Sequence, residues 1–211
     1  YFELPAPKIE KIMFNDFRKD PINFPLKTPS GKIEISSETI SNFQLSDCFS
    51  HPYWFEPYEW LGNIDEYPLH LISNQPTHRL HSQLDNAANS QNSKIKGKEP
   101  VMINPSDALE RDIQDGDIVM LFNKRGRVLA GANISDSVMP GVVVLSTGAW
   151  FDPDYALNLE RHGNPNVLTK DVGTSSLSQG PTCHTTLVQV KKAKREEIVD
   201  VNIFKTPETL N

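Results

Sequence analysis

The chain has 211 residues, of which 37% are hydrophobic and 23% charged, a composition typical of a globular protein with a buried core. Its formal net charge is -6 and it has no stripe of lysine and arginine, which disfavours proteins that bind a nucleic-acid backbone. The two cysteines, Cys48 and Cys183, lack CxxC spacing, so the sequence supports neither a disulfide framework nor a cysteine-rich zinc site.

Two features bear on how the chain is targeted. No apolar run is long enough for a transmembrane helix and no signal peptide is visible, so no membrane insertion is expected. The chain starts at Tyr1, and "YFELPAPKIEKIMFNDF" reads as the middle of a longer sequence. We therefore expect a processed or excised piece, whose export signal, if it has one, lies upstream.

Residues 1–66 are predicted to form an extended arm that crosses to another domain. The stretch contains prolines that interrupt any long helix, namely Pro5, Pro7, Pro21, Pro25 and Pro29. The motif "TPSGKIEISSE" predicts a turn followed by a short strand at residues 32–36. The aromatic "HPYWFEPYEWLG" is more typical of a segment pinned against a neighbouring surface than of a binding platform.

From Tyr67 onward the pattern changes to short apolar or alternating segments separated by turn residues. Six strands are expected, at residues 68–73, 99–105, 117–123, 127–135, 141–149 and 185–192. The "KRG" turn, centred on Arg125 and Gly126, joins the third strand to the fourth.

One helix is predicted within "NPSDALERDI". Asn104 is suited to the N-cap, Pro105 to the first helical position, and Gly116 to the left-handed conformation that precedes the next strand. Six strands with one short helix predict a mainly β, largely antiparallel barrel at residues 67–192, followed by a tail at residues 193–211.

Two long polar loops, at residues 73–98 and 150–184, are the candidate ligand-binding features. Both are rich in neutral amides and hydroxyls, which are suited to hydrogen bonding with the polar edge of a heterocycle. Their glycines allow backbone N–H groups to approach a ligand, and Arg79 and His81 are suited to a phosphate.

Composition alone favours a plainer interpretation of these two segments, as ordinary polar loops that bind no ligand. Polar loops are common, and no phosphate-binding signature of the Walker or GxGxxG type is present. His78 and His81 lack a third zinc ligand, and the adjacent Cys183 and His184 are not a catalytic dyad. The residues alone predict a β-barrel domain with two loops suited to a ligand.

Three segments carry a resemblance to a known family: "YPLHLISNQPTHRLHSQLDN", the stretch from "NPSDALERDI" to "GAWFDP", and "GNPNVLTKDVGTSSLSQGPTCHTTLVQV". In order and spacing they resemble the C-terminal domain of the dimethyl-sulfoxide-reductase family of molybdenum enzymes. The similarity is greatest to the trimethylamine-N-oxide, dimethyl-sulfoxide and biotin-sulfoxide reductase subgroup. It extends from Thr28 to Lys192 and implies a six-stranded double-psi β-barrel.

The resemblance also implies a ligand, bis-molybdopterin guanine dinucleotide with molybdenum, in the complete enzyme. The positions that it implies for cofactor contact are Asn74, Gln75, Arg79, His81, Ser82, Asn166, Gln179 and His184. Arg79 has an alternative role, pairing with an acidic group within the fold, and Trp150 either lines the pocket or packs. The family's metal ligand lies upstream of this domain, so no residue here is expected to be catalytic or to bind the metal.

The family implies oxygen-atom transfer from an N-oxide or S-oxide, with this chain inactive alone and dependent on the N-terminal domains of the same enzyme. A periplasmic location with a multihaem cytochrome donor is expected, with the cytoplasm as the alternative. The rival function is a self-standing, non-catalytic cofactor-binding module. A hydrolase that uses the Cys183–His184 neighbourhood is the less favoured third alternative, because it requires thiol-dependent activity from this chain alone.

Overall fold

A computed structural model describes residues 12–64 and 66–205 of the chain. The chain forms two compact units, Tyr1–Phe55 and Glu56–Asn211. All strands and all buried residues among the described positions belong to the second unit. The second unit therefore begins before Tyr67, where the barrel domain is predicted to start.

Residues 12–55 of the first unit contain two short helices, α1 (Asn15–Lys19) and α2 (Glu38–Ser41), joined by irregular chain. The Ser37 hydroxyl caps α2 by accepting a hydrogen bond from the Ile40 N–H. The strand predicted at residues 32–36 is wrong. Ile33 and Ile35 alternate as a strand requires, but they are 73% and 78% exposed and pair with no other strand among the described residues.

Aromatic side chains at alternate positions form a row at the end of the first unit. The Phe49 and Tyr53 ring centroids are 4.7 Å apart, and those of Tyr53 and Phe55 are 4.9 Å apart. In extended chain every second side chain points to the same side, which brings these rings together. That the row is pinned against a neighbouring surface stays a prediction.

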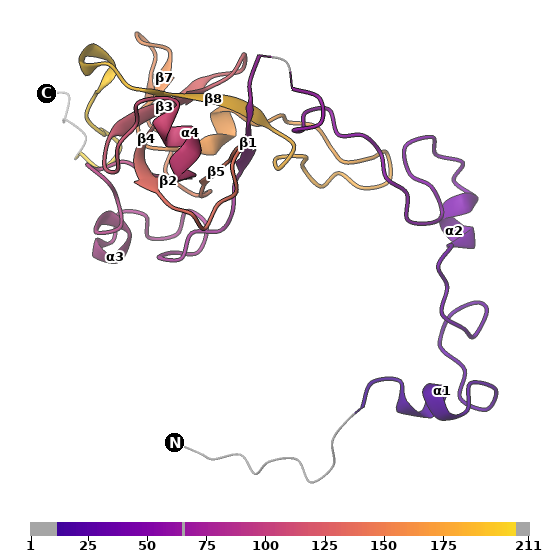
Figure 1. Ribbon diagram of the computed structural model, residues 1–211. Coiled ribbons are helices and arrows are strands. Elements are labelled where there is room, and N and C mark those ends of the chain that lie inside the picture. The colour runs from indigo at the N-terminus through magenta and orange to yellow at the C-terminus, as the bar shows by residue number, and fades with distance from the viewer. Residues whose placement is uncertain (1–11, 65, 206–211) are drawn as a thin grey trace, which may run out of the picture. The chain divides into compact units, whose positions relative to one another are not determined.

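A closed barrel forms the centre of the second unit (Figure 1). Its strands are β1 (Leu69–Ile72), β2 (Pro100–Ile103), β3 (Ile118–Phe122), β4 (Arg127–Ile134), β5 (Val142–Leu145) and β8 (Leu187–Lys192). They pair in the order β2-β5-β1-β8-β3-β4, and β4 pairs again with β2. The pairs β1–β5 and β2–β4 are parallel and the others antiparallel. The predicted six-stranded double-psi barrel is confirmed.

The core occupies the inside of this barrel. Leu71 lies opposite Val143 across the parallel β1–β5 pair, and Val101 lies opposite Leu145 across β2–β5. All four side chains are fully buried. Burying each of them stabilises the barrel by about 1.5–3 kcal/mol.

The predicted helix is α4 (Pro105–Leu109), which ends earlier than expected. The Asn104 side chain caps it, accepting the Ser106 N–H at 2.9 Å and donating to the Val138 carbonyl at 2.7 Å. Gly116 has the predicted left-handed conformation, with φ of 77°.

The two long loops carry short elements that the sequence did not reveal. The first contains α3 (Ala88–Gln91), and the second contains β6 (Pro153–Asp154), β7 (Leu159–Glu160) and the 3-10 helix η1 (Pro165–Val167). A second 3-10 helix, η2 (Arg195–Glu197), follows β8. Among residues 12–64 and 66–205, no helix has the length and apolarity to cross a membrane.

Candidate functional site

The loops that follow β1 and β5 meet beside the barrel. Because these two strands are parallel, their carboxyl ends lie at the same edge of the sheet. The Asn74 carbonyl accepts the Thr147 N–H at 2.9 Å, and the Asn74 side chain accepts the Ser146 hydroxyl at 2.8 Å. Asn74 therefore joins the two loops, and its side-chain oxygen is used in that contact.

A hollow of about 480 Å³ lies where these loops meet the segment before η1. It is lined by His81, Ser82, Thr147, Gly148, Ala149, Trp150, Phe151, Asn164, Asn166 and Ile203. Three of the residues predicted to touch a ligand, His81, Ser82 and Asn166, are brought together here from distant parts of the sequence.

The hollow offers neutral donors and acceptors. Gln75 Nε2 donates to Nδ1 of His81 at 3.0 Å, which leaves the proton of a neutral imidazole on Nε2. The hydroxyl of Ser82 and the side-chain amide of Asn166 form no hydrogen bond within the described residues. These groups are free to bind the polar edge of a ligand.

Gly148 allows the two loops to approach closely. Its φ is 93°, and a Cβ at this position would lie 2.1 Å from the carbonyl oxygen of His81. Any other residue would push the β5 loop away from the β1 loop and open the hollow.

Arg79 holds the same two loops from inside the protein. Its side chain is 1% exposed. Its guanidinium donates to the carbonyls of His81 at 3.0 Å and Thr147 at 3.1 Å, and it pairs with Glu99 at 3.1 Å. Arg79 therefore pairs with acidic groups within the fold, and its donors are used there, while its contact with a cofactor stays a prediction.

Further buried charges complete this network. Lys94 pairs with both Asp85 and Glu99, at 2.8 and 2.5 Å. Burial raises the pKa of Asp85, but hydrogen bonds from Lys94, the Trp150 N–H and Ser90 outweigh it, and the pKa is lowered. The carboxylate therefore stays charged and holds the backbone of Trp150, a residue that lines the hollow.

A buried carboxylate also supports the part of the lining that contains Asn164. Glu160 accepts the backbone N–H groups of Asp152, His162, Gly163 and Asn164. Burial raises the pKa of Glu160 although all four bonds oppose the rise. The turn they define presents Asn164, whose side chain caps η1 by accepting the Asn166 N–H.

Gln179 and His184 lie elsewhere. Gln179 is in a hairpin closed by the Gly173–Pro181 bridge, and its amide donates to the Ser175 carbonyl at 3.1 Å. Both residues are exposed, and neither lines the hollow. Their contact with a cofactor stays a prediction.

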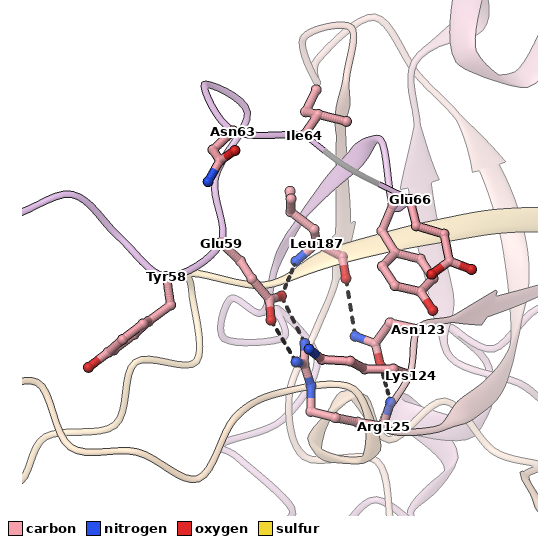
Figure 2. A pocket seen from close by; sticks show the side chains of 10 residues that line it. Tyr58, Glu59, Asn63, Ile64, Glu66, Asn123, Lys124, Arg125 and Leu187 are labelled. Carbon is pink, nitrogen blue, oxygen red and sulfur yellow. Dashed lines mark hydrogen bonds and ion pairs between the residues drawn. The ribbon is translucent and has the colours of Figure 1, made fainter.

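A second hollow, of about 460 Å³, lies between residues 58–67 and the β3–β4 turn (Figure 2). The Glu59 carboxylate lines it and is bound by Arg125 through both oxygens, at 2.6 and 2.9 Å, and by the Leu187 N–H at 2.8 Å. Burial raises the pKa of Glu59, but the Arg125 and Leu187 hydrogen bonds outweigh it and lower the pKa to about 2. The Glu59 carboxylate, the Arg125 guanidinium and the Leu187 N–H satisfy one another's hydrogen bonds. This cluster, called the Glu59 anchor, fixes the segment that leads into the barrel.

Within residues 12–64 and 66–205, no three His, Cys, Asp or Glu side chains gather to hold an ion. The hollow beside Trp150 is lined by no lysine or arginine from that part of the chain. Its chemistry suits the neutral heterocyclic part of a ligand better than a pyrophosphate.

Comparison with known proteins gives this arrangement a context. The profile of the molydopterin dinucleotide binding domain matches residues 69–187. The chain is 45% identical over 201 residues to trimethylamine-N-oxide reductase of Haemophilus influenzae, covering 93% of this chain and 24% of that protein. It is 50% identical to biotin sulfoxide reductase of Cereibacter sphaeroides, covering 83% of this chain and 24% of that protein.

Among solved structures, acetylene hydratase from Pelobacter acetylenicus matches with a TM-score of 0.65 at 16% identity. The match covers 82% of this chain and 25% of that chain, and it concerns the fold alone. The chain spans about a quarter of the length of the curated relatives it matches.

Proposed function

Because the chain belongs to the molydopterin dinucleotide-binding domain family, we propose that it is the cofactor-binding part of a molybdenum oxidoreductase that reduces an N-oxide or S-oxide. Relatives of this chain are named trimethylamine-N-oxide reductase and biotin sulfoxide reductase. The ligand is molybdopterin guanine dinucleotide, whose molybdenum supplies the oxygen-atom transfer in the complete enzyme.

The hollow formed by the β1 and β5 loops is the observation that carries this proposal. His81, Ser82 and Asn166 present hydrogen-bonding groups of both polarities, as the edge of a pterin or guanine ring requires. The residues fit such a ring. The chain's own part is to bind and orient the dinucleotide, while the chemistry belongs to the cofactor.

The remaining parts of the enzyme lie outside this chain in the proposal. The metal ligand and the substrate funnel belong to upstream domains of the same polypeptide, so this chain alone is inactive. The lengths of the relatives, about four times that of this chain, support such domains. A self-standing binding module is the alternative, and it requires that the chain hold its cofactor without further domains.

The test is Asn166→Ala in the complete protein. Loss of an unpartnered amide that contacts the ligand should lower dinucleotide content about three- to ten-fold, the effect of one lost polar contact. Content is measured as molybdenum and as guanosine monophosphate released by acid, each per mole of protein. Asn86→Ala is the matched control, because Asn86 is an exposed asparagine of the β1 loop that does not line the hollow. Equal content in both variants and the parent would contradict the proposal.

A further inference from the structure

The chain beyond β8 returns to the barrel and is fastened there at two points. Lys98, whose side chain is buried, donates from Nζ to the carbonyl of Val199 at 2.7 Å and to that of Arg161 at 2.7 Å. The Asp152 carboxylate accepts the Asn202 N–H at 2.5 Å. Residues 198–205 are thereby held against the barrel.

This path brings two apolar side chains to the hollow beside Trp150. Ile203 forms part of the lining of the hollow and is 39% exposed. Phe204 packs on Trp150, with ring centroids 5.3 Å apart, and stands edge-on to His162 at 5.0 Å. Aromatic pairs at these distances stabilise by about 0.5–1.5 kcal/mol each.

Trp150 is the residue through which Phe204 acts. Its indole N–H donates to the Ser82 carbonyl at 2.7 Å, and its own carbonyl is 3.0 Å from Nδ1 of His162. The indole therefore connects the β1 loop to the β5 loop at the hollow. Phe204 holds that indole in place from the side of the C-terminal segment.

We propose that residues 198–205 are a binding element that completes the hollow and retains a planar heterocycle of the bound dinucleotide. Ile203 and Trp150 supply an apolar flank for the face of the ring, and Phe204 is a positioning residue for Trp150. This inference rests on the proposed function. The segment lies outside residues 69–187, to which the family profile matches.

The experiment measures retention of the dinucleotide in the complete, loaded protein. After dilution into buffer without cofactor, protein is separated from released ligand at timed intervals, and bound guanosine monophosphate is determined after acid hydrolysis. Phe204→Ala should release the dinucleotide about three- to ten-fold faster than the parent, as expected when one partly buried apolar contact is lost. Phe204→Tyr keeps the ring and should restore slow release.

A second readout reports on Trp150 itself. In the 211-residue chain with its three tryptophans ¹⁵N-labelled, the Trp150 indole N–H should exchange with solvent faster in Phe204→Ala, and Phe204→Tyr should reverse this. A purely structural role for Phe204 would change the melting temperature without loosening this one hydrogen bond. Tyr155→Ala is the control, since Tyr155 is an aromatic residue that is 86% exposed.

Ile203→Ala is the second variant, and it serves as the test if Phe204→Ala impairs folding. Ile203 is partly exposed and lines the hollow. Release at the parental rate from folded Ile203→Ala and Phe204→Ala proteins overturns the inference and leaves the proposed function standing. Parental protein that contains no dinucleotide overturns the proposed function instead. Faster release from these two variants, but not from Tyr155→Ala, supports both.

Discussion

Glu59 shows how a single carboxylate with several partners stabilises the entry into the barrel. Its side chain is 15% exposed and bound by Arg125, Lys170 and the Leu187 N–H. With these partners, the charged carboxylate is more stable in the folded chain than in the unfolded chain. The folded-state pKa is about 2, against an ordinary value of 4.5.

Glu59→Gln should therefore destabilise the chain in a pH-dependent way. A depressed folded-state pKa contributes stability above pH 4.5, and this contribution is lost as the pH falls toward 2. Urea unfolding at pH 6 should show a loss of about 2–3 kcal/mol in the variant, and the difference from the parent should shrink by pH 2.5.

Glu110→Gln is the matched control for this charge. Glu110 pairs with Arg111 at 3.3 Å but is 71% exposed, and such surface pairs contribute little. A loss in Glu59→Gln that stays constant between pH 6 and pH 2.5 would show that the charge of Glu59 is not what stabilises the anchor.

Arg79 illustrates a role that its motif alone could not decide. "RLHSQL" places it among candidate ligand contacts, yet its guanidinium is used to join the His81 and Thr147 carbonyls to buried carboxylates. A lysine has one donor group and cannot reproduce this planar fork. Arg79 thus matters to the hollow by positioning the β1 and β5 loops that line it.

Arg79→Lys should cost about 2 kcal/mol of stability, because buried carbonyls lose donors while the positive charge remains. Urea unfolding followed by circular dichroism measures the loss. Arg127→Lys provides the comparison, as Arg127 also donates to backbone carbonyls, those of Leu157 and Asn158, but at a partly exposed site. Equal losses in the two variants would contradict a special role for the buried network.

Periodicity and capping residues were sufficient to predict the strands and the helix of the barrel, whereas its double-psi topology was implied only by the family resemblance. All six strands were predicted because each alternates or is apolar over several residues, and Asn104 with Pro105 marked the start of α4. The strand predicted at residues 32–36 failed because alternation describes a side-chain pattern and does not supply a partner strand.

The composition of the hollow could be predicted only in part. His81, Ser82 and Asn166 belong to motifs that the sequence presents, and Trp150 belongs to "GAWFDP". Ile203 carries no local signal, because its place depends on bonds between Lys98 and Val199 and between Asp152 and Asn202, far apart in sequence. Contacts of this kind follow from the folded chain and not from any pattern along it.

The two units of the chain differ in how they bury apolar surface. The Glu56–Asn211 unit has a core that includes Leu71, Val101 and Val143. Residues 12–55 include no buried residue, and large apolar side chains such as Met13, Ile22 and Ile35 are 72%, 87% and 78% exposed. We propose that these exposed side chains contact the upstream domains of the proposed enzyme, because exposed apolar surface is typical of protein–protein contact sites.

The isolated chain should therefore self-associate through residues 12–55, whereas a chain of residues 56–211 should stay monomeric, because it retains the core and the Glu59 anchor. Sedimentation velocity across a range of concentrations measures the association, and circular dichroism checks the barrel.

A chain of residues 67–211 is the matched comparison. It lacks the exposed surface too, but it has also lost Glu59. It should therefore be monomeric, yet about 2–3 kcal/mol less stable than residues 56–211. If the full 211-residue chain stays monomeric at every concentration, residues 12–55 need no partner.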